Sequence, residues 1–283
     1  MSTVQCILPA VAIAAIVWAT CFAAADIPPG GSRPAIRIEA NGFGGASEAD
    51  IRSVVNSAIG ELWRWFPDDK LEPIVIQRGH GGPITLYQRN DRGEIVVRLD
   101  VDGTYWAQFS YQVAHEFCHV LCGFREGPNP NKWFEETLCE TASLYAMRAM
   151  AHSWVKSPPY PNWAGFHDAL RDYADDVMTK RELVLEIDRL GLPAFYKLHR
   201  AELEANATSR ELNGAMAIVL LGLLERDPAQ WESVRWLNAT PAGANESLQD
   251  YLQRWLDAAP KSRRLFVRAV ANLFGLKLSH AGD

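Results

Sequence analysis

The sequence predicts an α+β fold in which a mixed half precedes a helical half. Up to about residue 152, short segments that alternate apolar and polar residues, as strands do, are interleaved with segments of helical spacing. From residue 153 onward the spacing is almost wholly helical, and the Pro-rich stretch 156–161 marks the boundary. The chain has 283 residues, of which 48% are hydrophobic and 22% charged, so it can bury a large core.

The first 25 residues predict an export signal. Residues 7–25 carry no charge, and three alanines, Ala23–Ala25, form a small-residue cleavage site before the polar segment that begins at Asp26. Because the leading segment lacks Lys and Arg and the 19 apolar residues can span a bilayer, an uncleaved membrane anchor is the alternative. We therefore expect an exported chain with a signal peptide at 1–25, an α/β half at 26–152 and a helical half at 153–283.

The α/β half contains strands, one helix and a hairpin before residue 102. Residues 34–40 alternate as a strand, and Ser47 is placed to cap a helix over 47–66. Residues 71–79 form a second apolar strand. Segments 84–89 and 94–101 flank the turn-rich Asn-Asp-Arg-Gly and predict a hairpin, whose second arm has one apolar and one polar face, as near a sheet edge.

Helices account for the rest. We expect a helix from a cap at Thr104 to Gly123, a loop over 123–132 and a helix from near Trp133 to His152. The later helical segments are expected near 165–189, 194–206, 209–226, 246–257 and 261–275.

The stretch Tyr111–Phe124 contains a possible metal site. His115 and His119 are four residues apart, so on a helix both imidazoles face one side and can bind one Zn²⁺. Glu116 is offset between them, where it can take a proton from a water activated by the metal. The pattern arises by chance in about 1% of chains of this composition.

A third ligand follows at a workable distance. Glu136 lies 17 residues after His119, and the intervening loop is long enough to turn a second helix back onto the first. Glu140 is one turn further, where it can accept the outer N–H of a ligand histidine. Glu135 is the rival ligand, but it lies about 100° from Glu136 around the helix, so only one of the two can face the ion.

This arrangement resembles the gluzincin metallopeptidases of the thermolysin and aminopeptidase N type, in which a Glu on the next helix follows His-Glu-x-x-His. The string Trp133–Glu140 places Glu136 on the ligand position and Glu140 on the supporting one, with Thr137 where a Gly is usual. The resemblance implies a zincin-like twisted sheet with an antiparallel edge strand, two metal-binding helices and a helical subdomain. The Gly-x-Met-Glu-Asn motif of aminopeptidases is absent, which leaves endopeptidase activity open.

Peptide hydrolysis also needs a donor to the developing oxyanion. The resemblance implies a Tyr or His beyond the third ligand, and our candidates are Tyr196 and His199, which lie three apart on an expected helix. The alternatives are Tyr160, His167 and Tyr173. Of the cysteines after the signal, Cys118, Cys122 and Cys139, the last two can bridge two helices, and all three can equally be buried thiols.

These observations predict an exported zinc-dependent peptidase with one Zn²⁺ and a peptide or protein as its substrate. The net charge of −6 disfavours nucleic acid as a partner, and a membrane is a partner only if the signal stays attached. The alternative is a catalytically inactive zincin-like protein of the envelope or cell surface that binds a partner.

Overall fold

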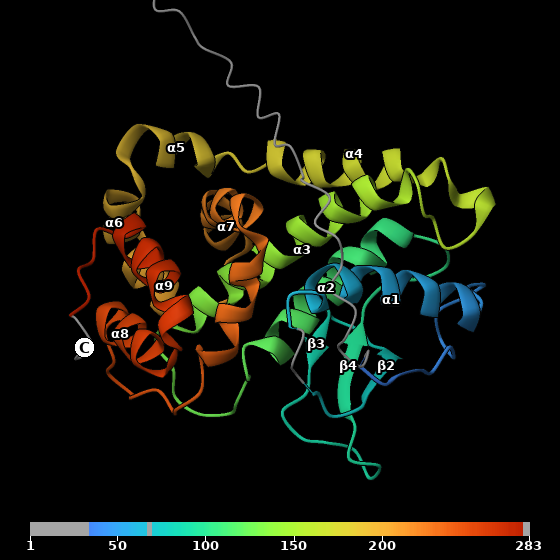
Figure 1. Cartoon of the computed structure of the whole chain (residues 1–283), viewed down its shortest axis with the longest axis horizontal. Helices are drawn as coiled ribbons and strands as arrows, with labels where there is room; N and C mark the ends of the chain where they lie inside the picture. The colour runs from blue at the N-terminus through green and yellow to red at the C-terminus, as the bar shows by residue number, and fades with distance from the viewer. Residues whose placement is uncertain (1–33, 67–69, 280–283) are drawn as a thin grey trace, which may run out of the picture.

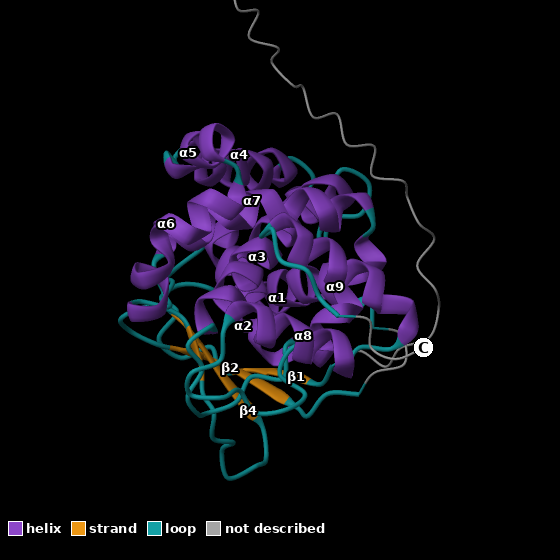
Figure 2. Cartoon of the chain, turned by 90° about the vertical axis from the view of Figure 1, so that its left-hand side faces the viewer, coloured by secondary structure: helices purple, strands orange, loops and turns teal. Residues whose placement is uncertain are grey.

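A small mixed sheet forms one side of the molecule (Figures 1 and 2). The computed structural model describes residues 34–66 and 70–279, and within them the sheet has the order β1-β2-β4-β3. Three of its strands are parallel, and β3 runs antiparallel to β4 at the edge. The strands are β1 (Ile36–Ile38), β2 (Ile74–Arg78), β3 (Ile84–Thr85) and β4 (Ile95–Leu99).

The alternation predicted for β4 is confirmed. Ile95, Val97 and Leu99 are buried in the hydrophobic core, whereas Arg98 is exposed. The other hairpin arm is shorter than expected: only Ile84 and Thr85 form β3, and Asn90 Oδ1 accepts backbone N–H bonds at 3.0 Å that close the turn before β4. The strand ends early because residues 87–89 leave the sheet.

Two helices cover the core face of the sheet. Helix α1 (Glu48–Trp63) starts at Ser47, whose hydroxyl accepts from the Asp50 N–H at 3.1 Å, as predicted. Helix α2 (Trp106–Leu121) packs on β3 and β4. The expected cap at Thr104 is wrong, because its side chain makes no capping bond and Tyr105 occupies that position. Gly123 follows α2 at φ +65°, which Gly adopts without strain.

Helix α3 (Lys132–Trp154) runs through the middle of the molecule (Figure 1). It is buried on almost all sides by α1, α2, α4 and α7, so it lacks the polar face of a surface helix. The Pro-rich stretch 156–161 follows directly after α3.

The second half is helical, as predicted. The segment expected over 165–189 is divided, because residues 180–182 separate α4 from α5. Two 3₁₀ segments that were not predicted are η1 (Pro161–Trp163) and η2 (Pro228–Trp236). The helices are α4 (Phe166–Thr179), α5 (Leu183–Leu190), α6 (Leu192–Ala205), α7 (Arg210–Arg226), α8 (Leu248–Ala258) and α9 (Lys261–Leu273).

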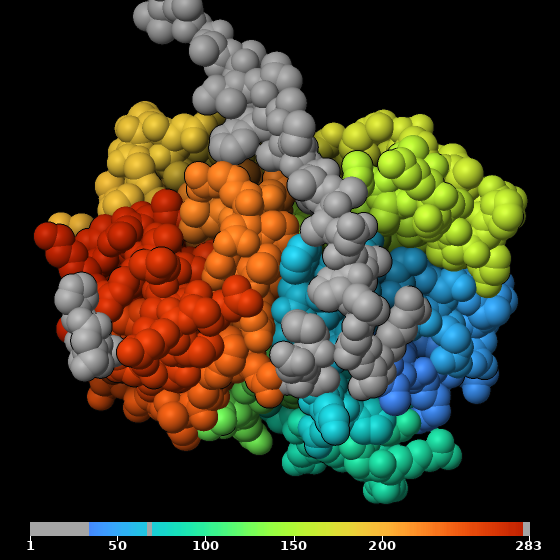
Figure 3. All heavy atoms as spheres, in the orientation of Figure 1, coloured from blue at the N-terminus to red at the C-terminus, as the bar shows by residue number. Residues whose placement is uncertain are grey.

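The buried core passes through both halves. Aromatic residues at the start of α3 meet those of the C-terminal helices: Trp133 stacks on Tyr196 at 5.4 Å, and Phe134 contacts Trp255 and Phe274. In the space-filling view, the orange and red segments from α7 onward lie on one side and the blue and cyan segments on the other (Figure 3).

The expected signal at 1–25 lies outside the described residues. Among the helices that the structure does describe, none has the length and apolar character needed to cross a bilayer.

A bidentate ion pair ties β1 to the residue before β4. Arg37 Nε and Nη2 donate to the two oxygens of Glu94 at 2.8 and 2.6 Å, and Asn90 donates to the same carboxylate at 2.8 Å. These bonds lower the pKa of Glu94 from 4.5 to about 2, with Arg37 as the main cause.

Glu94→Gln is expected to lower the free energy of unfolding by about 1–3 kcal/mol at neutral pH, because Glu94 is 7% exposed and loses its charged partner. A carboxylate with a lowered folded pKa stabilises the fold above its ordinary pKa, and this contribution is lost as the pH falls toward about 2. Urea unfolding should therefore show the gap between wild type and variant closing below a pH of 4.5. Glu72→Gln, which removes an exposed pair with Arg89, is the control and should cost less than about 1 kcal/mol. An equal cost for both variants contradicts the prediction.

Candidate metal centre

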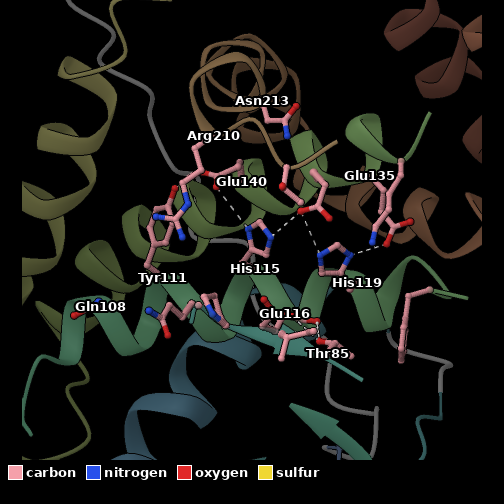
Figure 4. A pocket seen from close by; sticks show the side chains of 18 of the residues that line it. Thr85, Gln108, Tyr111, His115, Glu116, His119, Glu135, Glu140, Arg210 and Asn213 are labelled. Atoms are coloured by element: carbon pink, nitrogen blue, oxygen red, sulfur yellow. Dashed lines mark hydrogen bonds and ion pairs between the residues drawn. The ribbon is translucent and has the colours of Figure 1, made fainter. Parts of the chain in front are cut away.

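The site is built where α2 and α3 lie antiparallel (Figure 4). The contacts pair Tyr111 with Glu140, His115 with Glu136, and His119 with Glu135, so the residue numbers rise along one helix as they fall along the other. The loop between the helices reverses the chain, as the sequence predicted. This packing places the histidines of α2 opposite the glutamates of α3.

The two histidines and Glu136 converge on one point. Glu136 Oε2 lies 3.3 Å from His115 Nε2 and 3.6 Å from His119 Nε2. Burial raises the pKa of Glu136, but hydrogen bonds with both imidazoles outweigh it and hold that pKa well below its ordinary value. All three side chains also line a common cavity. Two imidazole nitrogens and a carboxylate oxygen at such separations form a donor set that suits Zn²⁺.

Each imidazole faces a second carboxylate with its other nitrogen. His119 Nδ1 is 2.6 Å from Glu135 Oε1, and His115 Nδ1 is 3.8 Å from Glu140 Oε1. A carboxylate beside Nδ1 favours the proton there and leaves the Nε2 lone pair free. Glu135, the rival ligand in the sequence, therefore holds His119 from outside. Glu140 lies beside His115, as expected, but at a distance longer than the hydrogen bond that was expected there.

These supporting carboxylates have partners of their own. Asn238 donates to Glu135 at 2.8 Å, and Tyr251 donates to Asn238 at 3.0 Å. Glu140 accepts a short hydrogen bond from the Tyr111 hydroxyl and lies 3.3 Å from Arg181 Nη2. These bonds supply donors to both carboxylates and fix their positions, which offsets the cost of burying them.

Glu116 faces the cavity but takes no part in the ligand cluster. It is 3% exposed, and Thr85 of the edge strand donates to its Oε2 at 2.8 Å. Its Oε1 makes no hydrogen bond with another described side chain. A buried carboxylate with one oxygen held and one free is suited to exchange a proton.

Cys139 is a second candidate for the third ligand. Its sulfur and a ring nitrogen of each histidine lie within 4.8 Å of one another. The thiol does not line the cavity; it is fully buried and hydrogen-bonded to Cys118, whose sulfur lies 3.9 Å from that of Cys122. All three thiols are free, so the bridge considered between Cys122 and Cys139 is not formed. Glu136 is the better ligand because it alone combines proximity to both Nε2 atoms with access to the cavity.

The cavity has a volume of about 530 Å³ and is lined by residues of both halves of the molecule. Tyr87, Phe124 and Lys132 line it beyond the C-terminal end of α2. The other end is lined by residues of α4, α7 and the segments before α5 and α7. These are Tyr173, Val177, Arg181, Thr208, Arg210 and Asn213.

The structure does not place the expected oxyanion donors in this cavity. Tyr196 packs its ring on Trp133, and His199 lies on Phe195 with its Nε2 3.1 Å from Glu186. Both residues therefore have packing roles at a distance from the histidine pair. Among the alternatives, Tyr173 lines the cavity, whereas Tyr160 and His167 do not.

Arg181 and Tyr111 are site residues that the sequence reasoning missed. Tyr111 had a detectable signal, because it lies one helical turn before His115 and shares its face. Arg181 had none, since only tertiary packing brings it to Glu140. It also contacts Glu211 at 3.2 Å, and its guanidinium lies against Gly214 of α7.

Comparison with known proteins gives no match, whether against family models, curated proteins or solved structures. The function has to be inferred from the site itself.

Gly214→Ala is expected to lower the melting temperature. A Cβ at this position would lie 2.3 Å from Arg181 Nε and 2.5 Å from its Cζ, and the guanidinium cannot retreat without leaving Glu140 and Glu211. Gly60→Ala in α1 is the matched control, because a Cβ there meets nothing within 4 Å. It should stabilise by about 0.5–1 kcal/mol through helix propensity alone. Thermal unfolding of both variants checks the prediction. Equal stabilisation by the two substitutions would contradict it.

Proposed function

We propose that this protein is an exported zinc-dependent peptidase. The single observation that carries the proposal is the position of Glu136 Oε2 at 3.3 and 3.6 Å from the Nε2 atoms of His115 and His119. The antiparallel edge strand, the two ligand-bearing helices and the helical half follow in the order that the gluzincin resemblance implies. This order supports the proposal without depending on any matched relative.

His115, His119 and Glu136 would hold the ion, and the cavity leaves room for substrate beside them. A zinc ion held there supplies Lewis acidity, which lowers the pKa of water and polarises a carbonyl. The donor set fits zinc because three protein ligands, with a supporting carboxylate beside each histidine, are the usual basis of a hydrolytic site.

Glu116 is the proton carrier in this proposal. Its Oε2 is held by Thr85, so Oε1 is the atom that takes a proton from the attacking water. The water oxygen bonds to the peptide carbonyl carbon, the C–N bond breaks, and the same proton passes from Oε1 to the leaving nitrogen. The products are an amine and a carboxylic acid, which then releases its proton to solvent.

The edge strand gives a peptide a place to bind. β3 pairs with β4 on one side, and its residues Ile84 and Thr85 line the cavity on the other. An extended peptide can add to such an edge through backbone hydrogen bonds, which brings its carbonyls past Glu116. Tyr173 is our candidate for the donor to the oxygen that gains negative charge, because its hydroxyl-bearing ring lines the same cavity.

Glu116→Gln should bind zinc like the wild type, at one ion per chain, while peptide hydrolysis falls by about 10²–10⁴-fold because the proton carrier is removed. Metal analysis and cleavage of a mixed peptide pool by mass spectrometry measure the two properties. Glu126→Gln, in the exposed loop between α2 and α3, is the matched control and should leave both unchanged. Wild-type hydrolysis by Glu116→Gln rejects the mechanism. Zinc binding without hydrolysis in any form of the protein favours the alternative, an inactive zincin-like binding protein.

The third ligand can be identified separately. Glu136→Gln should lose zinc during dialysis, whereas Cys139→Ser should retain it, because the thiol is outside the cavity. Zinc content after dialysis and the shift of the melting temperature on adding a chelator report the difference. The reverse pattern would assign the ligand to Cys139.

A further inference from the structure

Among the described residues, three cations line the cavity: Lys132, Arg181 and Arg210. Two of them are already engaged. Arg181 lies between Glu140 and Glu211, at 3.3 and 3.2 Å. Lys132 donates to the Tyr87 hydroxyl at 3.2 Å. It also lies close enough to Glu135 and Glu136 for an electrostatic attraction to their carboxylates.

Arg210 has no such partner. It is exposed at the start of α7, and no carboxylate of the described residues lies within 4.0 Å of its guanidinium. Its neighbour Glu211 is taken by Arg181. An unpaired arginine on an open surface needs no explanation, but this one lines a cavity that contains the candidate metal centre.

The acidic residues of the cavity are not available to Arg210 either, because each already has its own donors. Glu116 is bonded to Thr85, and Glu136 lies between the two histidines. Glu135 is bonded to His119 and Asn238, and Glu140 to Tyr111 and Arg181. Arg210 is therefore the cation of the cavity whose charge no neighbouring carboxylate neutralises.

The place of Arg210 along the cavity is defined by α2. Figure 4 shows Arg210 with Tyr111 and Gln108 on one side of His115, and Glu135 on the other. The start of β3 lies at the same end, because Gly82 donates to Asp100 and the backbone N–H of Asp100 donates to Gln112 of α2. Thr85, further along the strand, touches Glu116.

This geometry gives a bound peptide a direction. A peptide that pairs antiparallel with β3 runs from the Tyr87 end toward the Gly82 end, with its C-terminal part on the Arg210 side. A guanidinium binds a carboxylate with two parallel N–H bonds. We propose that Arg210 binds a carboxylate on the C-terminal side of the substrate, so that the preferred substrates are peptides with a negative charge there. The charge is either the free C-terminus or an acidic side chain. This inference rests on the proposed peptide substrate.

The test measures binding and therefore does not depend on turnover. Zinc-loaded Glu116→Gln protein is titrated into four fluorescein-labelled peptides of one alanine- and leucine-rich sequence. They end in a carboxylate or a carboxamide and carry Glu or Gln next to the last residue. Fluorescence anisotropy should show at least about tenfold tighter binding for one carboxylate-bearing form than for the neutral peptide. The peptide that binds more tightly shows whether Arg210 binds the C-terminal carboxylate or the acidic side chain.

Adding Arg210→Gln to the Glu116→Gln protein should abolish the tighter binding of the charged peptide. Arg210→Lys should keep part of it, because an ammonium retains the positive charge but not the two parallel N–H donors of a guanidinium. Arg226→Gln, at the other end of α7 and outside the cavity, is the control and should leave the gain intact. Zinc content and melting temperature should stay at the parent value in both Arg210 variants, since Arg210 makes no ion pair with any residue of 34–66 or 70–279.

Equal binding of charged and neutral peptides, a gain that survives Arg210→Gln, or no binding of any peptide overturns the inference. If charged peptides bind more tightly but the wild-type protein hydrolyses no peptide, the proposed function is rejected. The carboxylate-binding role of Arg210 is then still supported.

Discussion

The antiparallel contact between α2 and α3 is the constraint on which the rest of the site depends. It sets His115 and His119 opposite Glu135, Glu136 and Glu140, three carboxylates that are each less than 8% exposed. Such burial is unfavourable unless every charge has donors. The histidines satisfy part of this need, so the same contacts that organise the site also allow α3 to be buried on almost all sides.

The helical half completes the site from outside. Asn238 donates to Glu135 and accepts from Tyr251, and Arg181 donates to Glu140. The two carboxylates that support the histidines are therefore each held by a partner more than 40 positions away in sequence. The same half encloses one end of the cavity through α4 and α7. The N-terminal half supplies the two histidines, Glu116 and the edge strand, and the C-terminal half holds the supporting carboxylates and lines one end of the cavity.

Paired and unpaired charges lie at different ends of the cavity. The carboxylates near the histidines are fully engaged, while the end formed by α7 retains an unneutralised arginine. Arg210 thus attracts a negatively charged group of a ligand to one end of the cavity. The chain as a whole is acidic, with a net charge of −6, so this local positive charge is a property of the fold and not of the composition.

The sequence by itself determined most of the elements and the spacing of the candidate metal ligands on α2, because both are local. Helical spacing and the Ser47 cap fix α1, alternation fixes β4, and a separation of four residues on one helix is enough to place His115 and His119 on one face. Helix geometry indicated only that Glu135 and Glu136 cannot both face one ion, and the choice of Glu136 came from the gluzincin resemblance and from Glu140 one turn further along. Tertiary structure alone decided which side chains surround that pattern. Arg181 reaches Glu140, Tyr196 packs on Trp133 away from the cavity, and Arg210 enters it, because the packing of the helical half on α3 has no periodic signature in the chain.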